Sequence, residues 1–274
     1  MFVYSFELFF ARCELHINTD DKDFAGKVAY EIYVNAKDLE GKYGFYQASS
    51  QLYPLNYRTS NLCVISDELS NFIKLAKFYA DVTKGAFDIA LAGTLNEASS
   101  SSSLKEYMIK KKKLLPFASL DHITIDGNLL RFDNNFTKID LGGLIKEYAV
   151  DESIFFLKQL GIEGALVNFG GDLSAYGKYN GASWNVGVQN PDNASQNILE
   201  VGLNDNSLCT SGHLKHFHMI EDTVVSHIIS NGVNPYSQIS VLAPSATDAG
   251  VWSTALLINP DLILPSHITC MAMI

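Results

Sequence analysis

Two glycine-rich turns are the segments of this sequence best suited to bind a phosphorylated ligand. The first is IDLGG at residues 139–143, where an apolar run ends in Asp140 and leads directly into a helical pattern. The second is NFGGD at residues 168–172, at the end of another apolar run. Glycine lets the backbone approach a ligand closely, and the free N–H groups at a helix start favour phosphate. Taken singly, either segment is also consistent with a tight turn that binds nothing.

Three further segments carry residue types that could take part in chemistry. TKGAFD at residues 83–88 places Phe87 beside Asp88, either in a ligand site or as a helix stop followed by a core phenylalanine. HLKHFH at residues 213–218 resembles a transition-metal cluster, but no nearby cysteine or acid completes the ligand set, which favours strand histidines without a metal. His227 lies in a strand pattern that ends in a Ser-Asn-Gly turn, and alone it is more typical of a core histidine than of a base.

Helical patterns surround these segments. Apolar residues recur at helical spacing from Phe24 to Tyr43 and again over residues 67–82, where Ser66 or Asp67 can cap the helix. A third helix is predicted over residues 144–160, and a last one over part of residues 246–257.

Strand patterns are concentrated in the second half of the chain. The sequence predicts a short strand at residues 14–17 and a hairpin over residues 123–132, around Asp-Gly-Asn at 126–128. Further strands are predicted at residues 164–169, 184–189, 199–203, 224–229 and 238–242. Helices and strands come in blocks rather than in strict β–α–β alternation, so the predicted class is α+β.

Composition and charge exclude several function classes. The formal net charge of −10 argues against a nucleic-acid partner, whose binding needs a basic face. No run approaches 18 apolar residues, so no membrane span is predicted. The apolar N-terminus lacks a basic region, so the chain as it stands is predicted to be cytoplasmic; removal of a leader would make it periplasmic or membrane-tethered. The four cysteines have no CxxC spacing and are expected to be free thiols.

The order of these segments resembles that of the ApbE family, the FAD:protein FMN transferases. TKGAFD at 83–88 is similar to the family's GAFDP, IDLGGLIKEYAVD at 139–151 to LDLGGIAKGYAVD, and ALVNFGGD at 165–172 to ALVNxGG. CTSG at 209–212 resembles a TSG turn, SHII at 226–229 the HIIDP strand, and AGVWSTAL at 249–256 the motif ADALSTAL. Upstream, Tyr46 and SQLYPLN at 50–56 resemble the Y…SEIxxLN stretch. So many matches in one order are hard to obtain by chance.

The resemblance implies a fold and a ligand. The fold is an ApbE-like single domain over residues 1–274, with or without the family's last strand. In it, two sub-lobes of mixed or antiparallel sheets and flanking helices enclose a flavin cleft. FAD is the implied substrate and Mg²⁺ the implied metal. The implied reaction is Mg²⁺-dependent transfer of FMN from FAD to a Thr or Ser hydroxyl of an acceptor redox protein, with release of AMP.

The resemblance also implies roles for individual residues. Metal ligands are the Gly143 carbonyl and the Thr254 hydroxyl, with Asp248 as a substitute ligand if its segment is not helical. His227 is the implied base or orienting group. The implied flavin contacts are Tyr46, Ala86, Phe87, Asp88, Asp140, Lys146 and Ile229.

The sequence departs from the family pattern where metal and flavin would bind. Gly250 stands where the family has its metal-binding aspartate, four residues before Thr254. Asp248 lies two residues earlier, about 200° around a helix. Poor Mg²⁺ affinity is therefore expected, with Gly250→Asp raising it. Glu147 replaces the usual glycine after the lysine, residues 230–235 lack the arginine of DPRTG, and no MGT motif stands near residues 9–11.

These departures leave three hypotheses open. The protein is a Mg²⁺-dependent flavin transferase, a catalytically weak or inactive FAD-binding relative of the same fold, or an FAD pyrophosphatase that uses water as the acceptor.

Overall fold

A seven-stranded sheet forms the base of the molecule. The structure is a computed structural model and describes residues 1–212, 217–221, 223–226 and 236–274. All neighbouring strands of this sheet are antiparallel. In spatial order they are β1 (Phe2–Leu8), β2 (Ala11–Ile17), β6 (Ala165–Phe169), β7 (Asp172–Tyr176), β10 (Asn206–Gly212), β13 (Gln238–Ala243) and β14 (Thr269–Met273).

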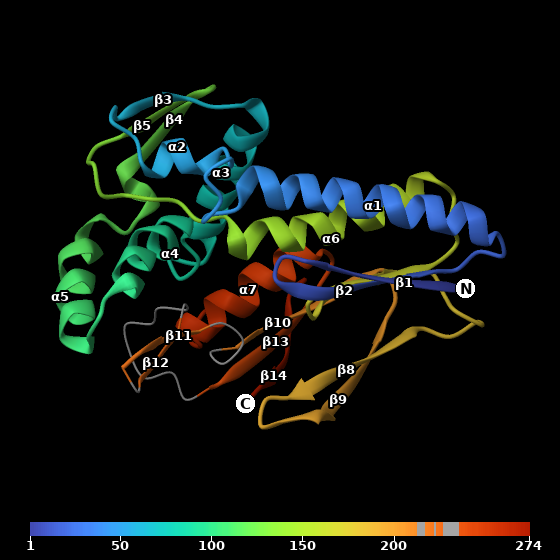
Figure 1. Ribbon diagram of the computed structural model, residues 1–274. Coiled ribbons are helices and arrows are strands. Elements are labelled where there is room, and N and C mark those ends of the chain that lie inside the picture. The colour runs from blue at the N-terminus through green and yellow to red at the C-terminus, as the bar shows by residue number, and fades with distance from the viewer. Residues whose placement is uncertain (213–216, 222, 227–235) are drawn as a thin grey trace.

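Three helices cover one face of this sheet, and a hairpin covers the other (Figure 1). The helices are α1 (Lys22–Tyr43), α6 (Gly142–Gln159) and α7 (Ala246–Ile258). Helix α6 is the central one, because it packs on α1 and α7 as well as on β6 and β7. The hairpin consists of β8 (Trp184–Asn190) and β9 (Asn193–Leu203), whose apolar residues pack on Leu166 of β6 and Ala175 of β7. Both faces of the sheet thus bury apolar side chains.

A smaller lobe is built from the part of the chain between α1 and α6. Its small sheet has the order β3-β5-β4, with β3 (Leu62–Val64), β4 (Ile123–Asp126) and β5 (Leu129–Phe132). Its helices are α2 (Leu52–Asn56), α3 (Asp67–Val82), α4 (Ile89–Asn96) and α5 (Leu104–Leu114). A further hairpin, β11 (Phe217–Ile220) with β12 (Thr223–Ser226), lies later in the chain.

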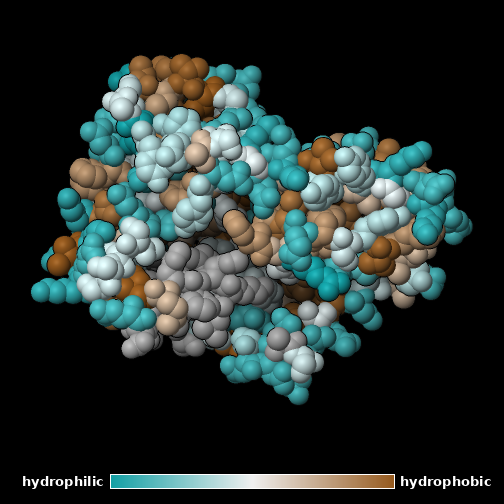
Figure 2. Space-filling model, in the orientation of Figure 1, coloured by the Kyte–Doolittle hydropathy of each residue, from teal (hydrophilic) through white to brown (hydrophobic). Residues whose placement is uncertain are grey.

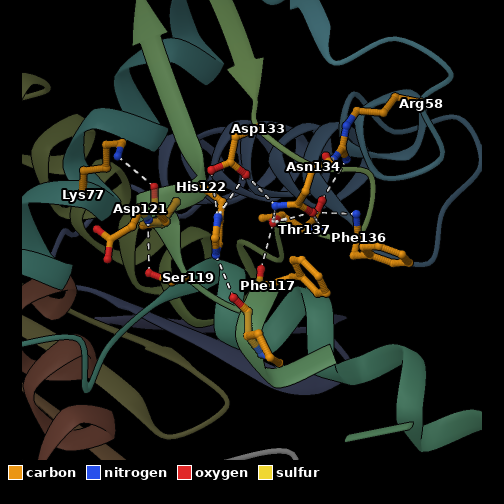
Figure 3. Close-up of polar contacts among 12 residues, drawn as sticks. Arg58, Lys77, Phe117, Ser119, Asp121, His122, Asp133, Asn134, Phe136 and Thr137 are labelled. Atoms are coloured by element: carbon orange, nitrogen blue, oxygen red, sulfur yellow. Dashed lines mark hydrogen bonds and ion pairs between the residues drawn. The ribbon is translucent and has the colours of Figure 1, made fainter. Parts of the chain in front are cut away.

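Polar side chains fix the loop that leads from β5 towards α6 (Figure 3). The guanidinium group of Arg58 donates hydrogen bonds to the carbonyl oxygens of Asn134 at 2.7 Å and Thr137 at 2.8 Å. The Asn134 side chain in turn accepts hydrogen bonds from the backbone N–H groups of Phe136 and Thr137. These bonds replace the ladder that an irregular segment lacks.

One surface of the small sheet is exposed and apolar. Val64 of β3 is 82% exposed, and it lies opposite Leu129 of β5, which is 37% exposed. Figure 2 shows apolar side chains gathered over this part of the molecule, at the top of the view. Among the described residues, Val64 and Leu129 thus remain open to solvent on this surface.

The fold confirms the predicted α+β class and most predicted elements. Helices α1, α3, α6 and α7 and the β4–β5 hairpin begin and end within a few residues of their predicted bounds. Ser66 is the N-cap of α3, and its hydroxyl accepts a hydrogen bond from Leu69. Strand β1 was not predicted, and of the strand predicted at 224–229 only the part up to Ser226 lies within the described residues.

The structure can be compared with two other predictions from the sequence, which concern the cysteines and membrane-spanning helices. The four cysteines are free thiols, as predicted. Across the described ranges, none of the helices is both long enough and apolar enough to cross a membrane. Strand β14 pairs with β13 at the edge of the large sheet.

The pair His122–Asp133 in the smaller lobe yields a prediction about pH. Nδ1 of His122 lies 3.0 Å from the Asp133 carboxylate, and Nε2 lies 2.8 Å from the carbonyl oxygen of Pro116. Both neighbours are acceptors, so the doubly protonated ring suits the site, and the hydrogen bond to Asp133 raises the pKa of His122 above its usual 6.5. The stabilisation is therefore complete below pH 6.5 and is lost as the pH rises through the raised folded-state pKa.

His122→Gln should consequently destabilise the protein more at about pH 6 than at about pH 9. Thermal denaturation of the two proteins at both pH values measures this difference. Asp133→Asn, which removes the charge that raises the pKa, should reduce the pH dependence in the same way. An equal loss of stability at both pH values would contradict the prediction.

Candidate active site

A cavity of about 360 Å³ lies between the helix-covered sheet and the smaller lobe. Aromatic residues from separate segments line its apolar part: Phe9 and Phe10 of the β1–β2 turn, Phe45 and Tyr46 after α1, and Phe87 before α4. Its polar part is formed by the start of α6, the β6–β7 turn, the end of β10 and one residue of α7, Thr254. The cavity thus combines a surface suited to a flat ring with one suited to charged groups.

Both glycine-rich turns face this cavity. Gly142 and Gly143 form the first turn of α6 and line it, and so does Gly170 of the second turn. Gly170 has φ +65°, and a Cβ there would lie 2.6 Å from Cβ of Ala11, so the position requires glycine for two reasons. The prediction that the two turns face one cleft is confirmed.

Asp140 is held by close backbone packing against the smaller lobe. Its N–H donates to the carbonyl of Ile89 at 3.0 Å, and the Asn56 side chain exchanges two hydrogen bonds, of 2.8 and 2.9 Å, with the backbone of Ile139. Gly93 of α4 packs directly on this segment, because a Cβ there would lie 2.7 Å from the carbonyl carbon of Ile139. Burial raises the pKa of the Asp140 carboxyl, although the N–H of Gly142 donates to it.

The segment before α4 supplies an apolar surface and a helix cap. Phe87 is buried, and its ring lies against Gly143, where a Cβ would be 3.5 Å from Cε2. Asp88 caps α4 by accepting hydrogen bonds from two N–H groups of that helix, and its second oxygen accepts one from Leu120 at 2.9 Å. Burial raises the pKa of Asp88, while these hydrogen bonds lower it. Ala86 and Asp88 line the cavity with Phe87.

Tyr46 also lines the cavity. Its ring is 66% exposed, and its hydroxyl is hydrogen-bonded to the side chain of Asn96. A largely exposed ring at a cavity rim has surface available for stacking on a ligand.

Three charged side chains meet in the polar wall. Lys146 of α6 forms an ion pair with Asp172 of β7, and its Nζ lies 3.9 Å from Oε1 of the neighbouring Glu147. Burial raises the pKa of Glu147 to about 8, with Lys146 lowering it and Asp172 raising it. The pKa of Lys146 is raised because the two carboxylates outweigh its burial. The sequence analysis named Lys146 as a site residue but not Asp172, although Asp172 is the acidic residue that ends the NFGGD segment.

Thr254 lies on α7, whose N-terminus is held by two side chains, those of Ser245 and Asp151. Ser245 is the N-cap, and the carboxylate of Asp151 on α6 accepts hydrogen bonds from the N–H groups of Ala246 at 2.7 Å and Thr247 at 2.9 Å. One helix therefore fixes the start of the next. Further along α7, the Thr254 hydroxyl lies 2.9 Å from the hydroxyl of Ser211.

Two positions bear on the missing metal ligand: Asp248, the candidate substitute, and Gly250, where the family has its aspartate. Asp248 is not among the residues that line the cavity; it is bonded to the Tyr79 hydroxyl at 2.9 Å and the Ser245 hydroxyl at 2.9 Å. Its segment is helical, so the condition under which it could replace the missing ligand is not met. A Cβ at Gly250 would lie 2.5 Å from Cγ of Glu147. An aspartate at position 250 would have to displace Glu147, so the expectation that Gly250→Asp alone raises Mg²⁺ affinity stays a prediction.

Two predicted site residues, His227 and Ile229, lie outside the described residues, as do His213 and His216. Within the described ranges, no group of three or more His, Cys, Asp or Glu residues is placed to hold a metal ion. The structure therefore brings Tyr46, Phe87, Asp140, Lys146 and Thr254 to one cavity, together with Ala86, Asp88 and Gly143.

A helix-covered antiparallel sheet whose cavity joins aromatic rings to glycine-rich turns and a partly buried lysine defines a class of protein whose cavity is suited to a flat, phosphorylated ligand. The ApbE family model matches residues 11–262, and the chain belongs to the ApbE family.

Relatives and solved structures agree with this membership. Proteins named FAD:protein FMN transferase from Vibrio cholerae serotype O1 and Haemophilus influenzae are each 24% identical to the chain, over 236 and 253 residues. The matches cover 81% of this chain and 70% of the first protein, and 85% and 72% for the second. The crystal structure of the ApbE protein from Thermotoga maritima has a TM-score of 0.83 at 21% identity, covering 94% of this chain and 86% of that one. The fold is that of ApbE proteins.

The backbone contact at Gly93 yields a prediction about the segment that carries Asp140. Gly93→Ala should lower stability by about 1–3 kcal/mol, because the added methyl group meets backbone atoms that cannot move aside. Gly41→Ala is the matched control, since nothing lies within 4 Å of a Cβ there and alanine favours a helix interior. Chemical denaturation of both variants measures the difference. Equal effects of the two substitutions would contradict the described packing.

Proposed function

We propose that this chain transfers FMN from FAD to a threonine or serine hydroxyl of an acceptor redox protein, releasing AMP. The observation that carries the proposal is that aromatic rings and both glycine-rich turns line one cavity. The names of the relatives support FAD as the donor and a protein as the acceptor.

The residues of the cavity can bind both ends of such a donor. The N-terminus of α6 carries the positive end of the helix dipole, so the pyrophosphate is favoured there. Lys146, which is paired with Asp172, lies in the same wall. Phe87 and Tyr46 provide apolar surface for the ring system. Binding both ends fixes the phosphorus atom relative to an incoming hydroxyl.

The donor set also fits Mg²⁺. Two carboxylates face one ammonium group in the polar wall, and one buried oxygen of Glu147 has no hydrogen-bond partner within the described ranges, which leaves room for a cation. The Thr254 hydroxyl and the Gly143 carbonyl would hold the ion, since Mg²⁺ accepts few protein ligands and keeps water and phosphate oxygens. When bound, Mg²⁺ supplies neutralisation of the charge that develops on the pyrophosphate.

The transfer itself is a displacement at phosphorus. The acceptor oxygen forms a bond to the FMN phosphorus, and the bond from this phosphorus to the AMP oxygen breaks. The hydroxyl proton passes to a base, for which His227 is the candidate from the sequence.

The experiment that tests the proposal incubates the protein with FAD and Mg²⁺, with and without an acceptor protein that contains an exposed threonine motif. Transfer predicts AMP release that depends on the acceptor, together with covalent flavin fluorescence on the acceptor in a denaturing gel. AMP release without an acceptor, accompanied by free FMN, would indicate a pyrophosphatase. FAD binding without AMP release in either sample would indicate a non-catalytic relative.

Tyr46→Ala should weaken FAD binding about three- to tenfold, because it removes an exposed ring from the cavity wall. Tyr30→Ala is the matched control: Tyr30 of α1 is 64% exposed, close to the 66% of Tyr46, but does not line the cavity. Titration of FAD followed by flavin fluorescence measures both affinities. A loss of the same size in both variants would remove Tyr46 from the proposed site.

A further inference from the structure

Gly250 lies within a buried helix, where glycine is the least favourable residue except proline. A Cβ at this position would lie 2.5 Å from Cγ of Glu147 and 3.2 Å from its Cδ. Cβ atoms do not approach other heavy atoms to 2.5 Å, so any side chain at position 250 would displace Glu147. Glycine is thus the residue that lets Glu147 lie against α7.

Glu147 carries a carboxyl group into the interior, where Asp172 and Lys146 are its neighbours and only one of its two oxygens lacks a hydrogen-bond partner among the described residues. The residue is 6% exposed, and its Oε2 forms no hydrogen bond within the described part of the chain. The nearest cation is Nζ of Lys146, at 3.9 Å from Oε1, and that ammonium group is in closer contact with Asp172. A buried carboxylate oxygen without a partner is costly unless a ligand completes its contacts.

The Glu147 side chain lies against the face of α7 that also carries Thr254. Residues 250 and 254 are four apart on the helix, so they lie on the same face, about 6 Å apart along the axis. Because Glu147 lies over Gly250, its carboxylate is presented about one turn from the Thr254 side chain. Glu147, Thr254 and Ser211 line the same cavity.

The charges in this wall favour a cation over a further anion. Glu147 and Asp172 together carry two negative charges when ionised, and Lys146 supplies one positive charge. A divalent cation beside them would compensate the excess and would also attract phosphate oxygens. One carboxylate and one hydroxyl, completed by phosphate and water oxygens, form a ligand set that suits Mg²⁺.

We propose that Glu147 is the anionic protein ligand of a divalent cation in this cavity, acting together with Thr254, and that Gly250 makes room for it. The inference rests on the proposed FMN transfer, because FAD brings to the cavity the pyrophosphate that shares the cation. The carboxylate for the metal is thus supplied by α6, although the hydroxyl ligand comes from α7.

The first experiment measures binding of Mn²⁺, as a spectroscopic substitute for Mg²⁺, by electron paramagnetic resonance of the free ion, with and without FAD. Glu147→Gln preserves the shape of the side chain but removes its charge, and it should weaken Mn²⁺ binding at least tenfold. Asp248→Asn is the matched control: it removes an acid from the same region, but one that faces Tyr79 and Ser245, so wild-type affinity is expected.

A second experiment moves the carboxylate from one helix to the other. Gly250→Asp alone should lower the melting temperature because it meets Glu147, and Glu147→Gly alone should lose Mn²⁺ binding. The double variant Glu147→Gly with Gly250→Asp removes the contact and restores an acid on the same face of α7. It should recover the melting temperature lost by Gly250→Asp and bind Mn²⁺ within about threefold of wild type.

Wild-type Mn²⁺ affinity in Glu147→Gln would overturn the assignment, as would the absence of Mn²⁺ binding by the wild-type protein both with and without FAD. FAD fluorescence and AMP release in the same samples separate this failure from that of the proposed function. If the wild-type protein transfers FMN while Glu147→Gln binds Mn²⁺ normally, only the role of Glu147 is overturned. If the wild-type protein binds no FAD, the proposed function and the role of Glu147 both fail.

Discussion

The burial of three charged side chains in one wall is the constraint on which this cavity depends. Lys146, Glu147 and Asp172 lie beside one another in the cavity wall, where the ion pair between Lys146 and Asp172 offsets part of the cost of their burial. The Lys146–Asp172 ion pair ties the first turns of α6 to the strand that follows the second glycine-rich turn, which keeps both turns at one end of the cavity. Gly250 leaves the space on α7 that Glu147 occupies.

Much of the fold could be predicted from local patterns. Long helices with a regular apolar stripe, such as α1 and α3, and a hairpin with Asp-Gly-Asn at its turn are specified by nearby residues. Strand β1 was missed because its residues also fit an apolar N-terminal segment, and only pairing with β2 makes it a strand. The helical state of residues 246–249, which decides the role of Asp248, is supported by the local cap Ser245 and also by Asp151, a residue distant in the sequence.

The candidate site shows a clearer limit of sequence reasoning. The motifs correctly indicated that the segments around Phe87, Asp140 and Thr254 come together, because each matched a known pattern in the same order. Glu147 and Gly250, by contrast, were interpreted as two separate losses. They contact each other in the structure, and the glycine at position 250 leaves the space that the glutamate at position 147 occupies. Such a compensation is a property of the space between two helices, and no local pattern can reveal it without knowledge of how α6 packs on α7.

The backbone conformation of the turn between β1 and β2 affects where the protein unfolds locally. Phe9 and Phe10 have φ values of 54° and 56°, a left-handed conformation that glycine and asparagine adopt more readily. Each phenylalanine therefore stores on the order of 1 kcal/mol of conformational strain at the rim of the cavity. Strand β1 is also the outermost strand of the sheet. Amide hydrogens at this end of the hairpin should consequently exchange with solvent through local fraying, well before the global unfolding that releases those of β6 and β7.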